Sequence, residues 1–299
     1  MAEFRYPERF LGVDEETSMR ETSAVWVLPI PFEMTTTYAG GTKLGPRSII
    51  EASNQLELYD IEMESEAAFA YGVHTLPFFH PTLDSLEAVS QSIADAVAGL
   101  NIQDQLLVTL GGEHGITPGL VRAFAAKYPG LMVVQIDAHS DLRDEYDGTP
   151  WSHACVARRW LPYAPTVQFG IRSTCPEEVE FIRQSDRVTV FRAAEMYVDR
   201  EHRYLDALKK LIEGRDVYLS IDVDGFDPSV FSATGTPEPG GIGWYDGLEL
   251  IRTVTEHSRV VAVDCVELAP ANASQASNYA AAKLVYKTIN YVMRSRGKV

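Results

Sequence analysis

Two apolar segments that each end in closely spaced acidic residues constrain this chain more than any other feature. The segments cover residues 131–136 (LMVVQI) and 216–221 (DVYLSI), and both are typical of buried parallel strands. Each is followed by side chains that often bind metals, namely Asp137, His139 and Asp141 after the first segment and Asp222 and Asp224 after the second. Alternate side chains of an extended backbone point to the same side, so each group is expected to converge on one point.

A third apolar segment, residues 105–110, leads to His114 through the sequence Gly111-Gly112-Glu113. The glycines allow a sharp turn that would place the imidazole over the edge of a sheet. Taken alone, His114 would more often be a structural histidine than a ligand. Together with the five other side chains it completes a set of two histidines and four aspartates. Four carboxylates at the ends of strongly apolar strands are costly unless they are paired or bound to metal.

The composition of this ligand set narrows the choice of metal. Carboxylates combined with imidazoles suit manganese or another octahedral divalent ion, whereas zinc sites more often contain cysteine and magnesium loses its waters reluctantly. Four carboxylate charges would balance two divalent ions, and a water between them would ionise near neutral pH to give a nucleophile. We therefore expect two divalent ions, either manganese or another ion of octahedral preference, and a hydrolytic reaction.

The overall composition argues against several other classes of protein. The chain has 299 residues and a net charge of −16 with no basic stripe, so a nucleic-acid partner is not expected. No apolar run approaches the ~18 residues that span a bilayer, so no membrane partner is expected either. The cysteines Cys155, Cys175 and Cys265 show no paired spacing, which is typical of a reduced compartment and indicates a cytoplasmic protein.

Strand-like and helix-like segments alternate along most of the chain. Further strands are expected at residues 24–30, 71–76, 166–171, 187–191 and 259–263. Helices are expected at residues 46–56, 83–100, 118–128, 176–184, 201–213, 245–255 and 275–293. This order predicts a single α/β domain over residues 1–299, with a mostly parallel sheet of about eight strands covered on both faces and residues 1–23 as an N-terminal arm. Binding sites in such sheets lie beyond the carboxyl ends of the strands, where all six candidate ligands fall.

Further polar residues near these strand ends are candidates for catalysis. His153 lies a dozen residues after Asp141, close enough to return over the metals, where it would be a proton shuttle. Glu267 ends the last strand and is either the partner of a cationic substrate or a salt-bridged surface group. Asp227 and Glu238, in the loop after the second aspartate pair, are expected to fix that loop rather than to act in catalysis.

The sequence resembles the ureohydrolase family, which includes arginase, agmatinase and formimidoylglutamase. The resemblance covers nearly the whole chain and is carried by the ordered blocks Gly111-Gly112-Glu113-His114, Asp137-Ala138-His139-Ser140-Asp141, Ser152-His153, Ser220-Ile221-Asp222-Val223-Asp224, residues 235–241 and Val266-Glu267-Leu268. It implies a three-layer α/β/α fold, two manganese ions, and hydrolysis of a guanidino group to urea and an amine.

The resemblance also implies roles for individual residues. His114, Asp137, Asp141 and Asp224 would bind one metal or bridge the two metals. The remaining coordination positions would be shared by Asp137, His139, Asp141, Asp222 and Asp224. His153 matches the acid/base histidine of the family and Glu267 its guanidinium-binding glutamate, and both are expected to contact the substrate. With the metal ligand Asp141 they form the expected catalytic set. Relatives form trimers or hexamers, so a homotrimer or homohexamer is expected here.

The identity of the guanidino substrate depends on residues near the expected entrance. After Asp141 the chain continues into bulky and charged residues, where arginases usually have a small polar residue. Acidic side chains there, Asp144 among them, favour a small substrate with a second cation, so we expect agmatine, cleaved to putrescine and urea in polyamine biosynthesis. Arg143 could instead pair with the carboxylate of guanidinobutyrate or formimidoylglutamate, and aminopropylagmatine and arginine also stay open. Ala154-Cys155 replaces the Gly-Thr common in the family and leaves the shape of the pocket open.

Two other classes of function compete with a ureohydrolase. The first is a metal-dependent hydrolase of amides or acetylated amines, because the deacetylase family resembles this fold. Such an enzyme would cleave an acetylated amine and release no urea from guanidines. The second is a catalytically inactive homologue with a binding or regulatory role, which would normally have lost a metal ligand. All six candidate ligands and His153 are present, which disfavours this second class.

Overall fold

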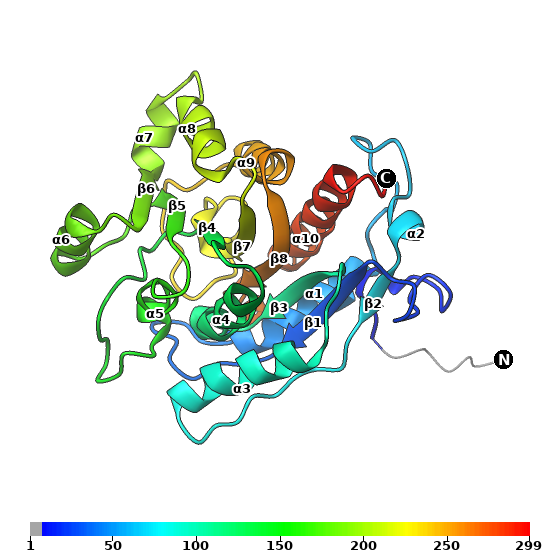
Figure 1. Ribbon diagram of the computed structural model, residues 1–299, viewed down its shortest axis with the longest axis horizontal. Helices are drawn as coiled ribbons and strands as arrows, with labels where there is room; N and C mark the ends of the chain where they lie inside the picture. The colour runs from blue at the N-terminus through cyan, green and yellow to red at the C-terminus, as the bar shows by residue number, and fades with distance from the viewer. Residues whose placement is uncertain (1–7) are drawn as a thin grey trace.

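The computed structural model describes residues 8–299, and its centre is an eight-stranded sheet in which all neighbouring strands are parallel (Figure 1). The strands are β1 (Val25–Ile30), β2 (Val73–Thr75), β3 (Leu106–Gly111), β4 (Met132–Ile136), β5 (Thr166–Ile171), β6 (Val188–Arg192), β7 (Asp216–Asp222) and β8 (Arg259–Val266). Their order in the sheet is β2-β1-β3-β8-β7-β4-β5-β6. The predicted number of strands and their parallel direction are confirmed.

Ten α-helices surround the sheet in the described part of the chain. They are α1 (Gly45–Ser53), α2 (Ala68–Tyr71), α3 (Leu86–Gly99), α4 (Thr117–Lys127), α5 (Val156–Trp160), α6 (Pro176–Gln184), α7 (Ala193–Val198), α8 (Arg203–Ile212), α9 (Trp244–His257) and α10 (Ala276–Ser295). The seven expected helices are all present. The sequence did not predict α2, α5 and α7, because helices of four to six residues are too short to show a helical period.

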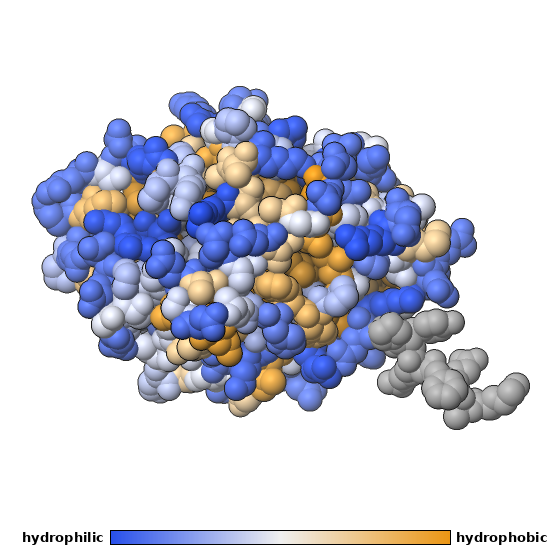
Figure 2. Space-filling model, turned by 60° about the horizontal axis from the view of Figure 1, so that its bottom comes forward, coloured by the Kyte–Doolittle hydropathy of each residue, from blue (hydrophilic) through white to orange (hydrophobic). Residues whose placement is uncertain are grey.

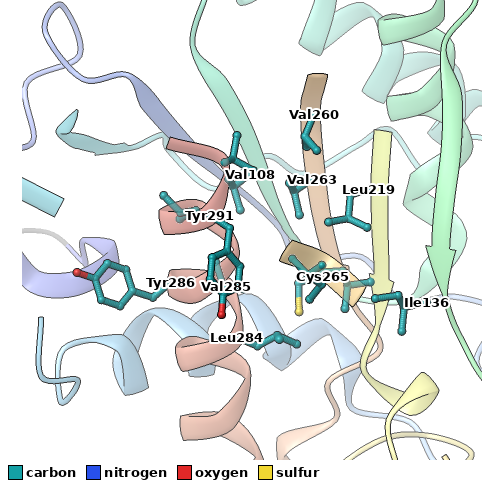
Figure 3. Packing of buried hydrophobic residues seen from close by; sticks show 14 of the residues in the cluster. Val108, Ile136, Leu219, Val260, Val263, Cys265, Leu284, Val285, Tyr286 and Tyr291 are labelled. Carbon is teal, nitrogen blue, oxygen red and sulfur yellow. The ribbon is translucent and has the colours of Figure 1, made fainter. Parts of the chain in front are cut away.

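The helices cover both faces of the sheet, so the molecule has three layers. On one face α1, α8, α9 and α10 pack on the strands, and Figure 3 shows Val108, Leu219 and Val263 of three neighbouring strands near Leu284 and Val285 of α10. On the other face the intervening strand side chains pack on α3, α4 and α5. Because both faces are buried, most strand positions are apolar, which explains why the strands read as continuous apolar runs.

The outer surface is mostly polar, in keeping with the net charge of −16. In the view of Figure 2 hydrophilic side chains cover most of the surface and hydrophobic ones gather in smaller areas. Within residues 8–299 no helix is both long enough and apolar enough to cross a membrane.

The described part of the expected N-terminal arm, residues 8–23, lies against the body of the protein. Phe10 and Leu11 are buried in the core. Their backbone N–H groups donate to Thr75 Oγ1 at 2.9 Å and to Ser53 Oγ at 2.7 Å, which ties the arm to β2 and α1. The first seven residues of the arm lie outside the described residues. A role for the arm in assembly and the single-domain organisation stay predictions.

The turn after β3 shows how closely the loops pack at the carboxyl edge of the sheet. A Cβ atom at Gly112 would lie 2.0 Å from the carbonyl oxygen of Phe32, in the loop after β1, so no larger residue fits there. The backbone N–H of Gly112 donates to Ile30 and that of Glu113 to Phe32. These bonds fix the chain immediately before His114.

Candidate metal centre and active site

The structure brings all six candidate metal ligands to the carboxyl edge of the four central strands. His114 follows β3, Asp137, His139 and Asp141 follow β4, Asp222 is the last residue of β7, and Asp224 lies in the next turn. In the sheet β4 and β7 are neighbours, and only β8 separates β7 from β3. Residues far apart in the sequence therefore meet because parallel strands end at the same edge.

The first group of ligands surrounds His114. Its Nδ1 atom lies 3.2 Å from Asp137 Oδ2 and 3.3 Å from both Asp141 Oδ2 and Asp222 Oδ2. This ring nitrogen is buried and has no hydrogen-bond partner among the described residues. A nitrogen and three carboxylate oxygens thus converge on one buried point, an arrangement that fits a cation at the centre.

The second group surrounds His139 and shares Asp137 with the first. His139 Nδ1 lies 3.0 Å from Asp224 Oδ2 and 3.7 Å from Asp137 Oδ1. Asp137 therefore presents one carboxylate oxygen to each group, and its position between two neighbouring sets of ligands fits a pair of ions.

One pair of aspartates lies otherwise than in the grouping that the family resemblance implies. Asp222, not Asp224, lies against His114, and Asp224 lies against His139. The reason is that β7 ends at Asp222 and a tight 3-10 turn follows, in which Asp222 Oδ1 accepts the N–H of Asp224 at 2.9 Å. The two carboxylates therefore do not point the same way, as they would along an extended strand.

The residues after β4 also depart from an extended strand. Asp141 has a left-handed backbone with φ 52°, which brings its carboxylate back to His114. Asp137 is held by Gln135 Nε2 at 2.7 Å and by the N–H of His139 at 2.6 Å. The candidate ligands do converge, as predicted, but turns after the strands bring them together and not the alternation of side chains along an extended strand.

The electrostatics of this cluster favour a bound cation. Burial, reinforced by neighbouring carboxylates, raises the pKa of Asp141 and raises that of Asp222 well above its ordinary value. Burial opposes ionisation of Asp137, but the neighbouring imidazoles of His114 and His139 outweigh it and lower the pKa of Asp137. Divalent ions bound between these side chains would favour the ionised forms of Asp141 and Asp222. The described residues thus contain a His/Asp cluster suited to binding metal ions.

His153 lies beside the cluster under a loop that follows β1. Its Nδ1 is 3.3 Å from Thr35 Oγ1, its Nε2 is 3.5 Å from Thr37 Oγ1, and the ring of Tyr146 meets it edge-on with centroids 6.3 Å apart. Burial, followed by the charges of His139 and His114, lowers the pKa of His153 to about 4. The ring is therefore neutral at pH 7 and can accept a proton.

Glu267 lies next to the backbone of His114. Its side chain is buried, its backbone is left-handed with φ 64°, and its Oε1 accepts the N–H of His114 at 2.6 Å. Burial raises the pKa of Glu267 well above the ordinary glutamate value. A cationic group placed against this carboxylate would favour its charged form.

The structure places the remaining acidic residues near the site in less direct positions. The side chain of Asp144 is 68% exposed and forms an ion pair with Arg159 at 2.9 Å. Its role in substrate binding stays a prediction, and a substrate cation would compete there with Arg159. Asp227 Oδ2 accepts the N–H groups of Gly240 and Gly241 at 3.0 and 3.2 Å, which agrees with the expected loop-fixing role.

Three residues that support the site were not predicted from the sequence. Arg172 donates to the backbone carbonyls of Asp224 at 2.6 Å and Glu238 at 2.7 Å, and so holds the turn after β7. The Glu113 carboxylate accepts hydrogen bonds from the N–H groups of Met34 and Thr35, both at 2.7 Å. The third residue, Asp264, is buried within β8. Arg172 and Glu113 follow strand ends, so the rule that found the aspartates would have found them too. A carboxylate inside an apolar strand would have revealed Asp264.

Comparisons with known proteins identify the family of this chain. Residues 23–290 match the arginase family. The chain is 40% identical to the N(1)-aminopropylagmatine ureohydrolase of Synechocystis sp., over 98% of this chain and 96% of the relative, and 34% identical to the agmatinase of Pyrococcus horikoshii, over 90% and 92%. The crystal structure of the agmatine ureohydrolase of Thermoplasma volcanium has a TM-score of 0.82 and 29% identity, covering 98% of this chain and 95% of that one.

The three-layer fold with a His/Asp cluster at the carboxyl edge defines a metal-dependent hydrolase, and this chain belongs to the arginase family. Within that family it is a ureohydrolase, an enzyme that hydrolyses the C–N bond of an amidino group. The resemblance and the α/β/α fold predicted from the sequence are both confirmed. Membership favours urea release over the alternative of amide hydrolysis.

Proposed function

We propose that this protein hydrolyses the guanidino group of a carboxylate-free cationic amine, with N(1)-aminopropylagmatine as the preferred substrate and agmatine as the second. The main support for this type of reaction is the buried Glu267 carboxylate beside the two groups of candidate metal ligands. The sequence alone favoured agmatine. The 40% identity to an N(1)-aminopropylagmatine ureohydrolase supports the longer substrate instead. Both substrates fit the net charge of −16, which attracts cations.

The ligand groups described above would hold two Mn²⁺ ions. His114, Asp141 and Asp222 would bind one, His139 and Asp224 would bind the other, and Asp137 would bridge them. When bound, the ions supply the Lewis acidity that lowers the pKa of water towards neutrality and polarises the substrate. Carboxylates and imidazoles in this ratio suit manganese, and the ions would balance the charges of the four aspartates.

Glu267 would bind and orient the guanidinium group. A guanidinium is planar and offers several N–H donors, so a carboxylate pairs with it in a defined orientation. The bond from the His114 N–H to Oε1 fixes the carboxylate and sets the direction of its other oxygen. Substrate binding would thereby bring the guanidinium carbon towards the metal-type groups that flank His114.

His153 would move the proton that the leaving amine needs. In the overall reaction water adds to the guanidinium carbon, the C–N bond to the alkyl nitrogen breaks, and that nitrogen gains both protons of the water, which gives R–NH₃⁺ and urea. A neutral imidazole at pH 7 can take a proton on the water side and pass it to the leaving nitrogen. Thr35 and Thr37 hold the ring for this transfer.

A urea-release assay on manganese-loaded protein tests the proposal. The panel is N(1)-aminopropylagmatine, agmatine, arginine, guanidinobutyrate and an acetylated amine. We expect kcat/KM to be highest for N(1)-aminopropylagmatine and next highest for agmatine. Faster turnover of arginine or guanidinobutyrate would contradict the proposed substrate class. Cleavage of the acetylated amine without urea from any guanidine would contradict the proposed reaction. A cytoplasmic location and a homotrimer or homohexamer remain part of the proposal.

A further inference from the structure

A buried carboxylate that the proposed mechanism does not use lies behind the first metal-type group. Asp264, in the middle of β8, is fully buried. Its Oδ2 accepts hydrogen bonds from Thr117 Oγ1 at 2.8 Å and Tyr218 OH at 2.7 Å, and its Oδ1 accepts one from Ser220 Oγ at 2.7 Å. These hydroxyl donors satisfy the carboxylate inside the sheet, where an unpaired charge would be costly.

Ser220 connects this carboxylate to the candidate metal ligand His114. Ser220 Oγ lies 3.0 Å from His114 Nε2. A serine hydroxyl has one proton to donate, and this proton is committed to Asp264. Ser220 must therefore accept the second bond, which requires a proton on His114 Nε2. The other ring nitrogen, Nδ1, is then free to present its lone pair to the point where Asp137, Asp141 and Asp222 converge.

We infer that Ser220 and Asp264 are positioning residues that hold His114 in the orientation and tautomer needed to bind a metal ion through Nδ1. The inference rests on the metal centre of the proposed function but not on the choice of substrate. Trp160 also contacts the ring, with centroids 5.8 Å apart, and restricts its movement. Packing alone does not decide which nitrogen carries the proton, whereas the bond to Ser220 does.

The matched pair Ser220→Ala and Tyr218→Phe separates this role from a general effect on Asp264. Each substitution removes one hydroxyl bond to the Asp264 carboxylate, but only Ser220→Ala breaks the connection to His114. Manganese binding to the metal-free full-length proteins is measured by isothermal titration calorimetry, together with their thermal unfolding. We expect Ser220→Ala to weaken one of two manganese sites about 10- to 100-fold and Tyr218→Phe to change either site by less than about threefold.

Asp264→Asn provides a second variant that keeps the volume of the side chain. It removes the charge behind Ser220, so the same manganese site is expected to weaken while the other is unchanged. Equal losses of affinity in Ser220→Ala and Tyr218→Phe would overturn the inference, as would wild-type affinity in both Ser220→Ala and Asp264→Asn. These measurements need no substrate. Failure of the wild-type protein to release urea would therefore overturn the proposed function and leave this inference standing.

Discussion

His153 is positioned by contacts between loops from three parts of the chain. Its backbone N–H donates to Thr35 Oγ1 at 2.9 Å, and that hydroxyl in turn donates to Glu113 Oε1 at 2.9 Å. The loop after β1, the turn after β3 and the segment after β4 thus meet at one threonine. Burial is the main reason that the pKa of this ring is low and the ring neutral at pH 7. The histidine is therefore available for proton transfer without binding a metal.

Replacing His153 by asparagine tests this role. We expect His153→Asn to lower kcat for urea release by about 10²- to 10⁴-fold, because a positioned acid/base group typically contributes that much. The manganese content should not change, since His153 belongs to neither group of ligands. Steady-state kinetics and metal analysis of the same samples provide the check. A variant that keeps wild-type kcat, or that loses its manganese, would contradict the proposed role.

The sequence identified which candidate ligands gather at the sheet edge, but not how they are arranged there. Residue type and position after a strand were enough to find Asp137 and His139, because parallel strands deliver their ends to a common edge. The left-handed backbone of Asp141 and the contact between Asp222 and His114 could not be predicted, since both depend on turns. The position of Ser220 behind His114 depends on the pairing of β7 with β8, which no local pattern encodes.

Among the elements, the turn between β3 and His114 is the most tightly constrained part of the site. We expect Gly112→Ala to lower the free energy of unfolding by about 1–3 kcal/mol or more, because the added Cβ would overlap the Phe32 carbonyl. Manganese affinity should fall as well, since the turn carries His114. Gly99→Ala, where a Cβ meets nothing within 4 Å, is the matched control and should be neutral or stabilise α3 by up to about 1 kcal/mol. Similar unfolding curves for both variants would contradict this view of the turn.

Helix α10 makes a buried ionic contact with the loop that contains Asp60. Lys287 Nζ lies 2.9 Å from Asp60 Oδ1, and Asn290 Nδ2 donates to Asp60 Oδ2 at 2.8 Å. Burial disfavours the charged carboxylate, but the bonds from Lys287 and Asn290 outweigh it and lower the pKa of Asp60. The loop that contains Asp60 is thereby fastened to α10.

This contact predicts a defined pH dependence of stability. We expect Asp60→Asn to lower the free energy of unfolding by about 1–3 kcal/mol at pH 7. Because the pKa of Asp60 is lower in the folded than in the unfolded protein, its contribution is complete above the ordinary aspartate value of 3.8 and is lost as the pH falls through the folded value. Urea unfolding of both proteins at pH 7 and below pH 4 measures the difference.

The exposed pair of Asp206 with Lys209, at 3.0 Å on α8, offers a control with the same chemistry. Asp206→Asn should change the free energy of unfolding by less than about 1 kcal/mol, since surface ion pairs contribute little. A loss in Asp60→Asn that stays constant through the acid range, or that is no larger than in Asp206→Asn, would contradict the assignment.

Strands were easier to predict than short helices. Burial on both faces makes β4 and β7 continuous apolar runs, and their ends were located to within a residue. Helix α5 has five residues and is defined by packing of Trp160 against the sheet rather than by a pattern of its own. Tertiary contacts therefore decide the elements that the sequence leaves open.

The charge of the whole molecule bears on how substrate reaches the site. A net charge of −16 creates a field that attracts cations, and salt screens such fields. We expect kcat/KM for agmatine, which carries two positive charges, to fall several-fold as the salt concentration rises from about 0.02 to 0.5 M. Guanidinobutyrate, a zwitterion, should show a weaker dependence in the same assay. An agmatine rate that is flat or rises with salt would argue against electrostatic attraction.

In the proposed metal centre, the ends of three strands bring six side chains together to bind two metal ions that share Asp137. Anomalous diffraction at the manganese absorption edge, from crystals grown with Mn²⁺, tests it most directly. We predict two peaks on either side of the Asp137 carboxylate, one within bonding distance of His114 Nδ1 and the other of His139 Nδ1. A single peak, or peaks away from both histidines, would contradict the account.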